Sequence, residues 1–315
     1  MRIVLQCDGT LPALKYGGTE RVVWGLARAL TDLGHSVTLL APAGSTSSFC
    51  QVRIYRPDRP IAQQVPDGTD LVHVQNAALP VETYPSISTL HGNAAPDAPR
   101  HPNTVYVSQD HARRHNGDCY VYNGLYWAEY AKPNLALPRS HVHFLGRAAW
   151  RIKNVRGAIR ISRRAGHKLV VMGGTRLNIT MGFRLTLARH VSFSGMVDDA
   201  TKAKVMQASR GLLFPVLWDE PFGLAMIESL YYGAPVFGSA RGSLPELIGP
   251  DVGTLSNNEA DLVAALVDPD PKHPHTCHAY AAEQFCAARM AGDYLNVYEH
   301  VLNHGHVPRN LEQTE

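Results

Sequence analysis

Short apolar segments alternate with amphipathic ones along most of this sequence, and this alternation constrains the fold more than any other feature. Residues 2–7 (RIVLQC) and 36–42 (SVTLLAP) are apolar runs of strand length. Between them, residues 18–35 carry apolar side chains at helical spacing, and Gly34 is a helix stop signal. Strands that alternate with helices build right-handed βαβ units around a mostly parallel sheet.

The same rhythm continues and is interrupted once. Residues 131–141 (AKPNLALPRSH) contain two prolines and little periodicity, which indicates a linker. Further strands are expected at 52–57, 70–76, 86–92, 104–108, 119–125, 143–147, 168–174, 191–195, 211–217 and 235–240, and further helices at 153–165, 198–209, 222–232 and 276–304.

The simplest fold for this pattern is α/β, with two doubly wound, Rossmann-like domains that face each other across a cleft. We expect an N-terminal domain at 1–140 and a C-terminal domain at 141–290. The last segment, 291–315, is expected to form a helix and tail that pack back toward the N-terminal domain.

Composition excludes several classes of protein. Hydrophobic residues make up 45% and charged residues 18% of the 315, which is typical of a globular chain. The net charge of +3 is too mild to indicate a nucleic-acid-binding surface. Five scattered cysteines without a CxxC pair favour free thiols in a reducing compartment. No apolar run approaches the roughly 20 residues of a membrane span, and Asp8 comes too early for a signal peptide.

Candidate ligand-binding residues follow the expected strands, because open α/β sheets bind ligands at the carboxyl ends of their strands. Gly17 and Gly18 precede the first helix, where a phosphate could approach the backbone N–H groups; an ordinary loop is the alternative. His91 ends a strand and could hydrogen-bond a sugar or stabilise charge, although a lone histidine is more often structural. No P-loop or GxGxxG motif is present, which disfavours NAD and P-loop chemistry.

Two cations follow the strand at 143–147. Arg147 ends this segment and Lys153 begins the next helix, an arrangement that suits a diphosphate; two surface cations are the alternative. The helical spacing of Arg156, Arg160, Arg163 and Arg164 indicates a solvated helix face.

The stretch 219–230, DEPFGLAMIESL, holds two carboxylates. Glu220 precedes a helix whose first N–H groups would come from Phe222, Gly223 and Leu224. Glu228 falls in an apolar run, and a buried charge needs a partner. That partner could be a ligand's vicinal diol, or it could be Arg147 or Lys153. A glycosidase acid–base pair is disfavoured, because one carboxylate caps the helix and the other lies beneath it.

Together these residues resemble the retaining, nucleotide-sugar-dependent glycosyltransferases of family 4, which have the GT-B fold. The resemblance covers nearly the whole chain, and its most specific parts are DEPFGLAMIE (219–228) and GAPVFGSARGSLPELI (233–248). The run Arg-Ile-Lys-Asn around Lys153 lacks the proline and glycine common in the family, and Ser243 stands where a second glycine often follows Gly242. The YGGTE opening and short length look similar to small bacterial members that make antibiotics or surface glycans.

The resemblance implies a role for each matching residue. Gly17 and Gly18 would approach the donor phosphates, Arg147 and Lys153 would neutralise the diphosphate, and His91 would lie near the donor sugar. Glu220 would hold sugar hydroxyls, the amides of Phe222, Gly223 and Leu224 would contact the sugar and phosphate, Glu228 would bind the ribose, and Met196 and Val197 would border the base.

The implied activity is retaining, metal-independent transfer of a hexosyl group from a UDP- or GDP-sugar to a hydroxyl of a glycan, lipid or small molecule, without a cofactor. Asp198 and Asp199 are expected to cap a helix, and His273, His275 and His278 to lie in a loop. Alternatives are a nucleotide-sugar epimerase, a non-catalytic nucleotide-sugar binder and a protein that binds nucleic acid or membrane surfaces. The expected location is the cytoplasm, with scope for peripheral contact at the inner face of the cytoplasmic membrane through lipid-linked acceptors.

Overall fold

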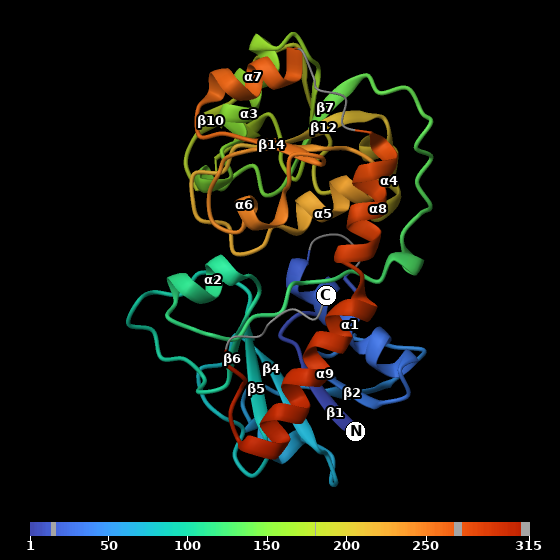
Figure 1. Ribbon diagram of the computed structural model, residues 1–315, viewed down its shortest axis with the longest axis vertical. Helices are drawn as coiled ribbons and strands as arrows, with labels where there is room; N and C mark the ends of the chain where they lie inside the picture. Colours follow the sequence, from blue (N-terminus) through green and yellow to red (C-terminus); the bar gives the residue numbers. More distant parts are fainter. Residues whose placement is uncertain (14–16, 180, 268–272, 310–315) are drawn as a thin grey trace. The chain divides into compact units, whose positions relative to one another are not determined.

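The computed structural model describes residues 1–13, 17–179, 181–267 and 273–309 (Figure 1). The chain divides into two compact units. Unit 1 comprises Met1–Trp127 and Phe285–Glu315, and unit 2 comprises Ala128–Gln284. The sequence had suggested divisions after residues 140 and 290.

Unit 1 is built on a six-stranded parallel sheet in the order β3-β2-β1-β4-β5-β6 (Figure 1). Its elements are β1 (Arg2–Gln6), α1 (Gly18–Asp32), β2 (Ser36–Ala41), β3 (Gln51–Ile54), η1 (Ile61–Gln64), β4 (Leu71–Gln75), β5 (Ser86–Leu90), β6 (Thr104–Tyr106), α2 (Gln109–Arg114) and α9 (Ala287–His304). The 3-10 turn η2 (Trp127–Glu129) lies where the chain passes between the units.

The C-terminal helix α9 belongs to unit 1 and packs against α1. Two of its tyrosines reach polar groups in the sheet core. Tyr298 Oη lies 2.8 Å from Nδ1 of His73, and Tyr294 Oη lies 2.7 Å from Oγ1 of Thr89. The other ring nitrogen of His73 lies 2.7 Å from the same Thr89 oxygen, so one buried chain of hydrogen bonds links β4, β5 and α9.

Unit 2 repeats this topology with a parallel sheet in the order β11-β8-β7-β12-β13-β14. Its elements are β7 (His141–Leu145), η3 (Arg151–Lys153), α3 (Val155–Arg164), β8 (Leu169–Met172), β9 (Leu177–Asn178), β10 (Arg184–Leu185), β11 (Val191–Phe193), α4 (Asp199–Gln207), β12 (Ser209–Phe214), α5 (Leu224–Tyr231), β13 (Val236–Gly238), α6 (Leu244–Leu247), β14 (Gly253–Leu255), α7 (Glu259–Val267) and α8 (Pro274–Gln284). Numbered within each unit, both sheets have the doubly wound order 3-2-1-4-5-6. The prediction of two doubly wound α/β domains is confirmed.

The predicted strand at 119–125 is wrong. This segment makes only isolated bridges, one of which pairs Leu125 with Cys286. It touches β6 at one point, where the Val121 amide donates to the Tyr106 carbonyl at 2.8 Å, and then turns to α9, where the Gly124 amide donates to Sδ of Met290 at 3.1 Å. A Cβ on Gly124 would lie 2.3 Å from the carbonyl oxygen of Cys286, so the absence of a side chain permits this contact.

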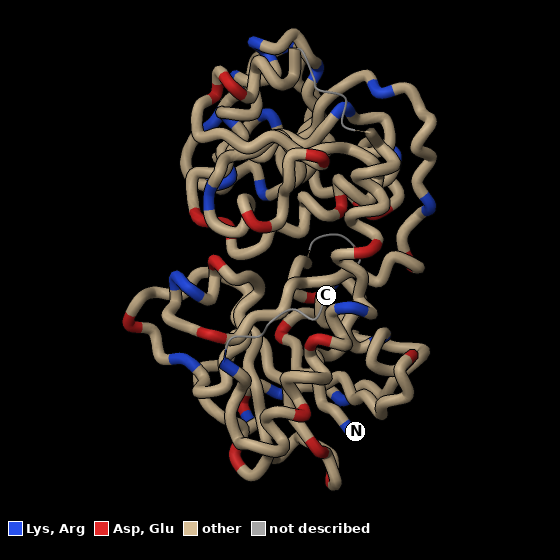
Figure 2. Tube along the Cα trace, viewed as in Figure 1, with Lys and Arg blue, Asp and Glu red and all other residues tan. Residues whose placement is uncertain are grey.

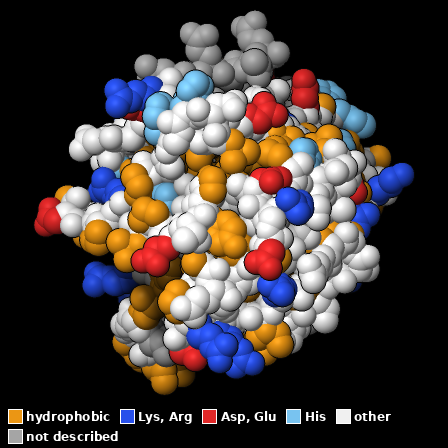
Figure 3. All heavy atoms as spheres, turned by 90° about the horizontal axis from the view of Figure 1, so that it is seen from below, with side chains coloured by type: hydrophobic (Ala, Val, Ile, Leu, Met, Phe, Trp, Pro, Cys, Tyr) orange, Lys and Arg blue, Asp and Glu red, His pale blue; other side chains and the backbone are white. Residues whose placement is uncertain are grey.

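Charges of both signs are spread over the surface. Figure 2 shows lysine and arginine positions gathered around α3 and β10 of unit 2, and the face in Figure 3 carries basic side chains interspersed with acidic ones. All five cysteines are free thiols. Among the described residues, every helix falls short of the length and apolarity that a bilayer-crossing helix needs.

Candidate functional site

The candidate site of unit 2 lies at the carboxyl ends of its two central strands. β7 and β12 are neighbours in the sheet, and the strand order reverses between them. In doubly wound sheets, ligands bind in the crevice beyond this reversal, where helix N-termini converge. Arg147 and Lys153 follow β7, and Glu220 follows β12. The topology therefore brings two segments that are far apart in the sequence to one edge of the sheet.

Lys153 and Glu220 form a largely buried ion pair at this edge. The Lys153 Nζ lies 2.6 Å from Glu220 Oε2, and their side chains are 14% and 8% exposed. The same oxygen accepts a hydrogen bond from Trp218 Nε1 at 2.7 Å. The ammonium also lies over the Trp218 ring, 4.8 Å from its centroid. Among the described residues no hydrogen bond is recorded for the second oxygen, Oε1, which leaves it available to a ligand hydroxyl.

The loop that carries Glu220 is fixed from behind by Gly242 and Ser243. The Ser243 amide donates to the Glu220 carbonyl at 2.9 Å, and its hydroxyl donates to the Phe222 carbonyl at 3.0 Å. Gly242 has φ +58°, and a Cβ there would lie 2.3 Å from the Glu220 amide nitrogen. Ser243 had been noted only as a departure from a family pattern, and its positioning role is visible only in three dimensions.

Arg147 occupies a tight loop that is tied to β8. The Ala148 amide donates to the Gly173 carbonyl at 2.9 Å, and a Cβ on Gly173 would lie 2.3 Å from the Gly146 carbonyl oxygen. This close approach, with φ +105° at Gly173, requires glycine. The Arg147 side chain is exposed, and its guanidinium lies 5.6 Å from the centroid of the Trp150 ring. It is therefore placed to meet a ligand from solvent.

The helix α5 begins directly after Glu220 and lacks a side-chain cap. Its N-cap, Gly223, is left-handed with φ +91° and makes no side-chain hydrogen bond. Phe222 is 2% exposed and anchors the turn, while Leu224 opens the helix. An uncapped N-terminus leaves first-turn N–H groups for an anionic or hydroxylated ligand.

Glu228 lies about one turn inside α5. It is paired with a lysine that the sequence analysis did not identify. Lys202 on α4 bonds to Glu228 Oε1, and both side chains are 7% exposed. Lys202 also lies 2.8 Å from Asp199. The alternatives of Arg147 or Lys153 as the internal partner of Glu228 are therefore wrong, because Lys153 binds Glu220 instead. Among the described residues, Oε2 of Glu228 has no recorded partner, so a diol could still bind there.

The remaining candidates of unit 2 lie in the loop between β11 and α4. Met196 and Val197 are partly exposed in this loop. Asp198 caps α4 by accepting from the Thr201 amide at 2.8 Å, as predicted. His275 and His278 are helical, in α8, and not in a loop. In the described part of the chain, no group of three or more His, Cys, Asp or Glu side chains is arranged to hold a metal ion.

Gly17, Gly18 and His91 belong to unit 1. Gly17 is the N-cap of α1 with φ 154°, and Gly18 is the first residue of the helix. Tyr16, which precedes them in the YGGTE stretch, lies outside the described residues. A Cβ on Gly17 would lie 2.8 Å from Glu20 Oε2, so the glutamate of this stretch packs against the glycine loop.

The His91 ring is held at the end of β5. Its Nε2 lies 2.6 Å from Gln75 Oε1, and its amide donates to Asn76 Oδ1 at 2.9 Å. Burial lowers the pKa of His91 to about 4, because desolvation disfavours the imidazolium. At neutral pH the ring is therefore uncharged, which suits hydrogen bonding to a hydroxyl and not charge neutralisation.

Comparison with known proteins relates most of unit 2 to a protein family. Residues 139–268 match the family model described as "Glycosyl transferases group 1". This part of the chain is similar to group 1 glycosyltransferase domains. The domain includes Arg147, Lys153, Lys202, Glu220 and Glu228, so every charged residue of the candidate site in unit 2 falls inside it. The predicted kinship with the family 4, GT-B glycosyltransferases is confirmed.

Two mycobacterial proteins are similar to this chain. The GDP-mannose-dependent alpha-(1-6)-phosphatidylinositol dimannoside mannosyltransferase of Mycobacterium tuberculosis is 28% identical over 132 residues, 41% of this chain. That match covers 34% of the relative, so it spans about a third of its length. The phosphatidyl-myo-inositol mannosyltransferase of Mycolicibacterium smegmatis is 25% identical over 326 residues, 85% of this chain and 84% of the relative.

A solved structure supports the fold of the whole chain. AviGT4, a glycosyltransferase involved in avilamycin A biosynthesis, superposes with a TM-score of 0.76. The superposition covers 96% of this chain and 98% of AviGT4 at 19% identity. At this identity the likeness establishes a shared fold.

Proposed function

We propose that this protein is a glycosyltransferase that moves a hexosyl group from a nucleoside diphosphate sugar to an acceptor hydroxyl, with retained anomeric configuration and without a metal ion. The observation that carries the proposal is the Lys153–Glu220 pair, which lies at the carboxyl ends of β7 and β12 beside the uncapped start of α5. This arrangement offers a cation for phosphate, a carboxylate oxygen for sugar hydroxyls and free backbone N–H groups.

The proposed roles follow from these contacts. Lys153 and Arg147 stabilise the charge that develops on the departing diphosphate, and charge stabilisation of this kind is a large catalytic term. Oε1 of Glu220 accepts hydroxyl hydrogens of the transferred sugar, because Oε2 is already bonded to Lys153 and Trp218. Oε2 of Glu228 accepts from the ribose diol, because Oε1 is bonded to Lys202. In both carboxylates one oxygen fixes the side chain and the other faces the ligand.

Retention is proposed because the departing phosphate can take the acceptor proton on the face where the new bond forms. A covalent glycosyl intermediate would need a nucleophilic carboxylate, and each of the two site carboxylates shares its charge with a lysine, which weakens it as a nucleophile. The transition state is oxocarbenium-like, with positive charge on the sugar and growing negative charge on the diphosphate that Arg147 and Lys153 face.

The proposed donor carries uridine or guanosine diphosphate. The M. tuberculosis relative is named for GDP-mannose, which favours a GDP-sugar. The proposed acceptor is a glycan, lipid or small-molecule hydroxyl; the two mycobacterial relatives are named for phosphatidylinositol acceptors. We propose a cytoplasmic location with peripheral contact at the membrane.

The deciding experiment is thermal unfolding of the wild type in the presence of GDP, UDP, ADP and dTDP and their sugars. A ligand at a hundred times its Kd adds about 2.7 kcal/mol of stability, a shift of several degrees in Tm. Stabilisation by one nucleotide, lost in Glu228→Ala, is the expected result. Stabilisation by none of them would contradict a nucleotide-sugar site.

The reaction itself is tested by incubation of the stabilising nucleotide sugar with candidate acceptors. Release of the free nucleotide that depends on acceptor is the expected result. Conversion of the sugar without acceptor would indicate an epimerase, and binding without any conversion would indicate a non-catalytic binder.

A further inference from the structure

The β9–β10 hairpin of unit 2 has its polarity reversed with respect to an ordinary surface hairpin. Along residues 183–187 the side chains alternate between exposed and buried, and the exposed ones are apolar. Phe183, Leu185 and Leu187 are 68%, 53% and 78% exposed, whereas Arg184 and Thr186 between them are buried. Antiparallel pairs on a protein surface normally turn their apolar face to the core.

The facing strand has the same reversal. Leu177 pairs directly with Leu185, so the two leucines lie on one face of the hairpin, and Leu177 is 52% exposed. Ile179 and Met181 continue this apolar set at 76% and 60% exposed. An exposed apolar cluster of this kind indicates a site of contact with a membrane or with another protein. We call residues 177–179 and 181–187 the apolar hairpin.

The buried face of the apolar hairpin is held by arginines. Arg184 donates to Thr186 Oγ1 at 2.7 Å and to the Thr175 carbonyl at 2.9 Å, and it lies 5.0 Å from the ring centroid of Phe193. Arg176 donates to the carbonyls of Thr186, Ala188 and Val191. These bonds fix which face of the hairpin points outward, so the exposure of the apolar side chains is built into the fold.

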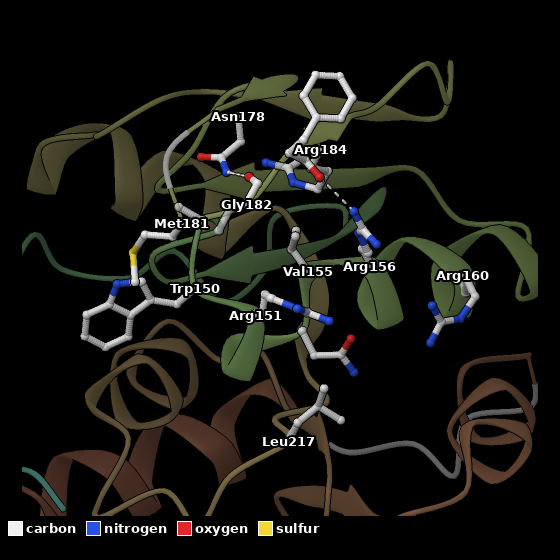
Figure 4. A pocket seen from close by; sticks show the side chains of 14 residues that line it. Trp150, Arg151, Val155, Arg156, Arg160, Asn178, Met181, Gly182, Arg184 and Leu217 are labelled. Carbon is white, nitrogen blue, oxygen red and sulfur yellow. Dashed lines mark hydrogen bonds between the residues drawn. The ribbon is translucent and has the colours of Figure 1, made fainter.

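A pocket of about 440 Å³ opens beside the apolar hairpin and is lined by cations (Figure 4). Arg151 comes from η3, Arg156 and Arg160 come from α3, and Arg184 comes from β10. Figure 4 shows Arg151 and Arg156 reaching toward the pocket from below, with Arg184 bordering it on the hairpin side. No aspartate or glutamate is among its lining residues.

Most of this positive charge lacks a counter-ion among the residues that the structure describes. Arg160 pairs with Glu259, with two bonds at 3.2 and 2.5 Å. Arg156 donates to the Phe183 carbonyl, and among the described residues neither it, Arg151 nor Arg184 has an ion pair with a carboxylate. Arg184 is 7% exposed, and a buried guanidinium without a counter-ion favours binding of an anion.

We propose that the apolar hairpin and the arginine pocket form a membrane-docking site, in which the hairpin enters the interface of a bilayer and the pocket receives an anionic phospholipid headgroup. Apolar side chains next to unpaired cations match a surface whose phosphates lie just outside its acyl chains. A second copy of the chain fits less well, because a symmetric contact through this face would bring arginines against arginines.

This site is separate from the arginines Arg100, Arg113 and Arg114, which belong to unit 1. Arg100 donates to the His115 carbonyl at 2.9 Å, and Arg114 pairs with Asp110 at 2.6 Å. Two of those three arginines are thus engaged inside unit 1. The docking proposal does not depend on sugar transfer, since it rests on a surface that Glu220 and Glu228 do not line.

The test is cosedimentation of the full chain with vesicles of phosphatidylcholine alone and of phosphatidylcholine mixed with phosphatidylglycerol. The wild type is expected to bind the mixed vesicles at low salt and to lose most of that binding at high salt or without phosphatidylglycerol. Phe183→Ser with Leu185→Ser should weaken binding about tenfold or more, since both side chains would leave the apolar phase. Arg151→Ala and Arg156→Ala should weaken it roughly fivefold each.

Matched controls come from unit 1. Ile54→Ser with Leu79→Ser removes two side chains that are 57% and 74% exposed, and Arg59→Ala removes an exposed arginine. These variants should bind vesicles like the wild type. Circular dichroism and Tm should be unchanged in all the variants, because every substituted side chain is exposed or lines the open pocket.

Two outcomes would overturn the proposal. The first is a wild type that does not bind the mixed vesicles. The second is a hairpin variant that binds them as well as the wild type. If the sedimentation coefficient of that variant also changes, the apolar hairpin would be assigned to a contact between copies of the chain.

Discussion

The Nζ of Lys153 lies 2.6 Å from Oε2 of Glu220 although the two residues are 67 positions apart. One follows β7 and the other follows β12, so the pair joins the two strands between which the sheet order reverses. The pair also fixes both charges before any ligand arrives. Preorganised charge of this kind needs no rearrangement at the moment of reaction.

Removing either member of this pair should damage activity more than a surface change does. We expect Lys153→Met and Glu220→Gln each to lower kcat about 10²-fold or more, because each removes a charge aimed at the donor. Lys153→Met should also destabilise the fold by about 3 kcal/mol, since it leaves a largely buried carboxylate unpaired. Initial rates of nucleotide release and urea unfolding measure both effects. Lys168→Met, at an exposed site of the same unit, is the control, and equal losses there would contradict the role of the pair.

Substitution of Arg147 should lower the catalytic rate without changing the stability of the fold. Its side chain is exposed, so Arg147→Ala should leave Tm unchanged while kcat falls about 10²-fold, or roughly 3 kcal/mol of transition-state stabilisation. The same substitution at Arg163, an exposed residue of α3, should alter neither quantity. An unchanged kcat in Arg147→Ala would remove this residue from the proposed mechanism.

The buried Lys202–Glu228 pair should report nucleotide binding. We expect Glu228→Gln to abolish most of the thermal stabilisation by the preferred nucleotide, because the amide presents one oxygen instead of two and carries no charge. The variant should also be less stable by itself, since Lys202 keeps only Asp199. Lys202→Met with Glu228→Gln should recover part of that stability without recovering nucleotide binding. Recovery of binding in the double variant would mean that Glu228 acts only through the fold.

Gly242 should be intolerant of a side chain. An alanine there would be strained at φ +58° and its Cβ would lie 2.3 Å from the Glu220 amide nitrogen. The two effects together should cost about 3 kcal/mol and displace Glu220, with a loss of kcat. Gly166→Ala provides the control, because Gly166 has φ +74° and no neighbour within 4 Å of an added Cβ. That variant should lose about 1 kcal/mol and retain activity.

Acid should destabilise the protein through its buried histidines. Burial lowers the pKa of His143 to about 3, from an ordinary value of 6.5, because the core disfavours the imidazolium. Between pH 6.5 and about 3 the unfolded chain therefore binds one more proton at this histidine than the folded chain does. The free energy of unfolding therefore decreases as the pH falls, by about 1.4 kcal/mol per pH unit for each such group.

His143→Asn should flatten the dependence of unfolding free energy on pH by that amount. Denaturant unfolding at several pH values between 4.5 and 6.5, roughly the accessible part of that window, measures the slope. The control is His275→Asn, at an exposed position of α8. Identical slopes for the wild type and His143→Asn would show that His143 is not a source of acid sensitivity.

Local sequence pattern was sufficient to anticipate the residues at the ends of central strands. Lys153 and Glu220 each lie in the loop that follows an apolar run, and the strand-helix alternation implied that such positions meet at one sheet edge. The same reasoning expected a specific partner for Glu228. It did not find Lys202, because a lysine on α4 has the pattern of a solvent-facing residue until α4 is placed beside α5.

The apolar hairpin was missed for a different reason. β9 and β10 have two residues each, which is too short for a recognisable strand pattern. Their apolar side chains are also on the exposed face, so the alternation of apolar and polar residues did not indicate strands that pack on a core. Ser243 was likewise invisible as a positioning residue, because its hydrogen bonds to Glu220 and Phe222 close a gap of more than 20 positions. Both features depend on contacts between segments that are distant in the sequence, and such contacts produce no periodic pattern in the sequence.

The chain enters and leaves unit 2 through two segments held side by side, since the Leu125 amide donates to the Phe285 carbonyl and the Ala287 amide to the Leu125 carbonyl, both at 2.9 Å. Unit 2 is thus one continuous insertion, whereas unit 1 is assembled from both ends of the chain. During synthesis, unit 2 can complete its core before α9 exists. The half of the protein that is translated first must wait for Tyr294 and Tyr298 to satisfy Thr89 and His73, so it is expected to finish folding last.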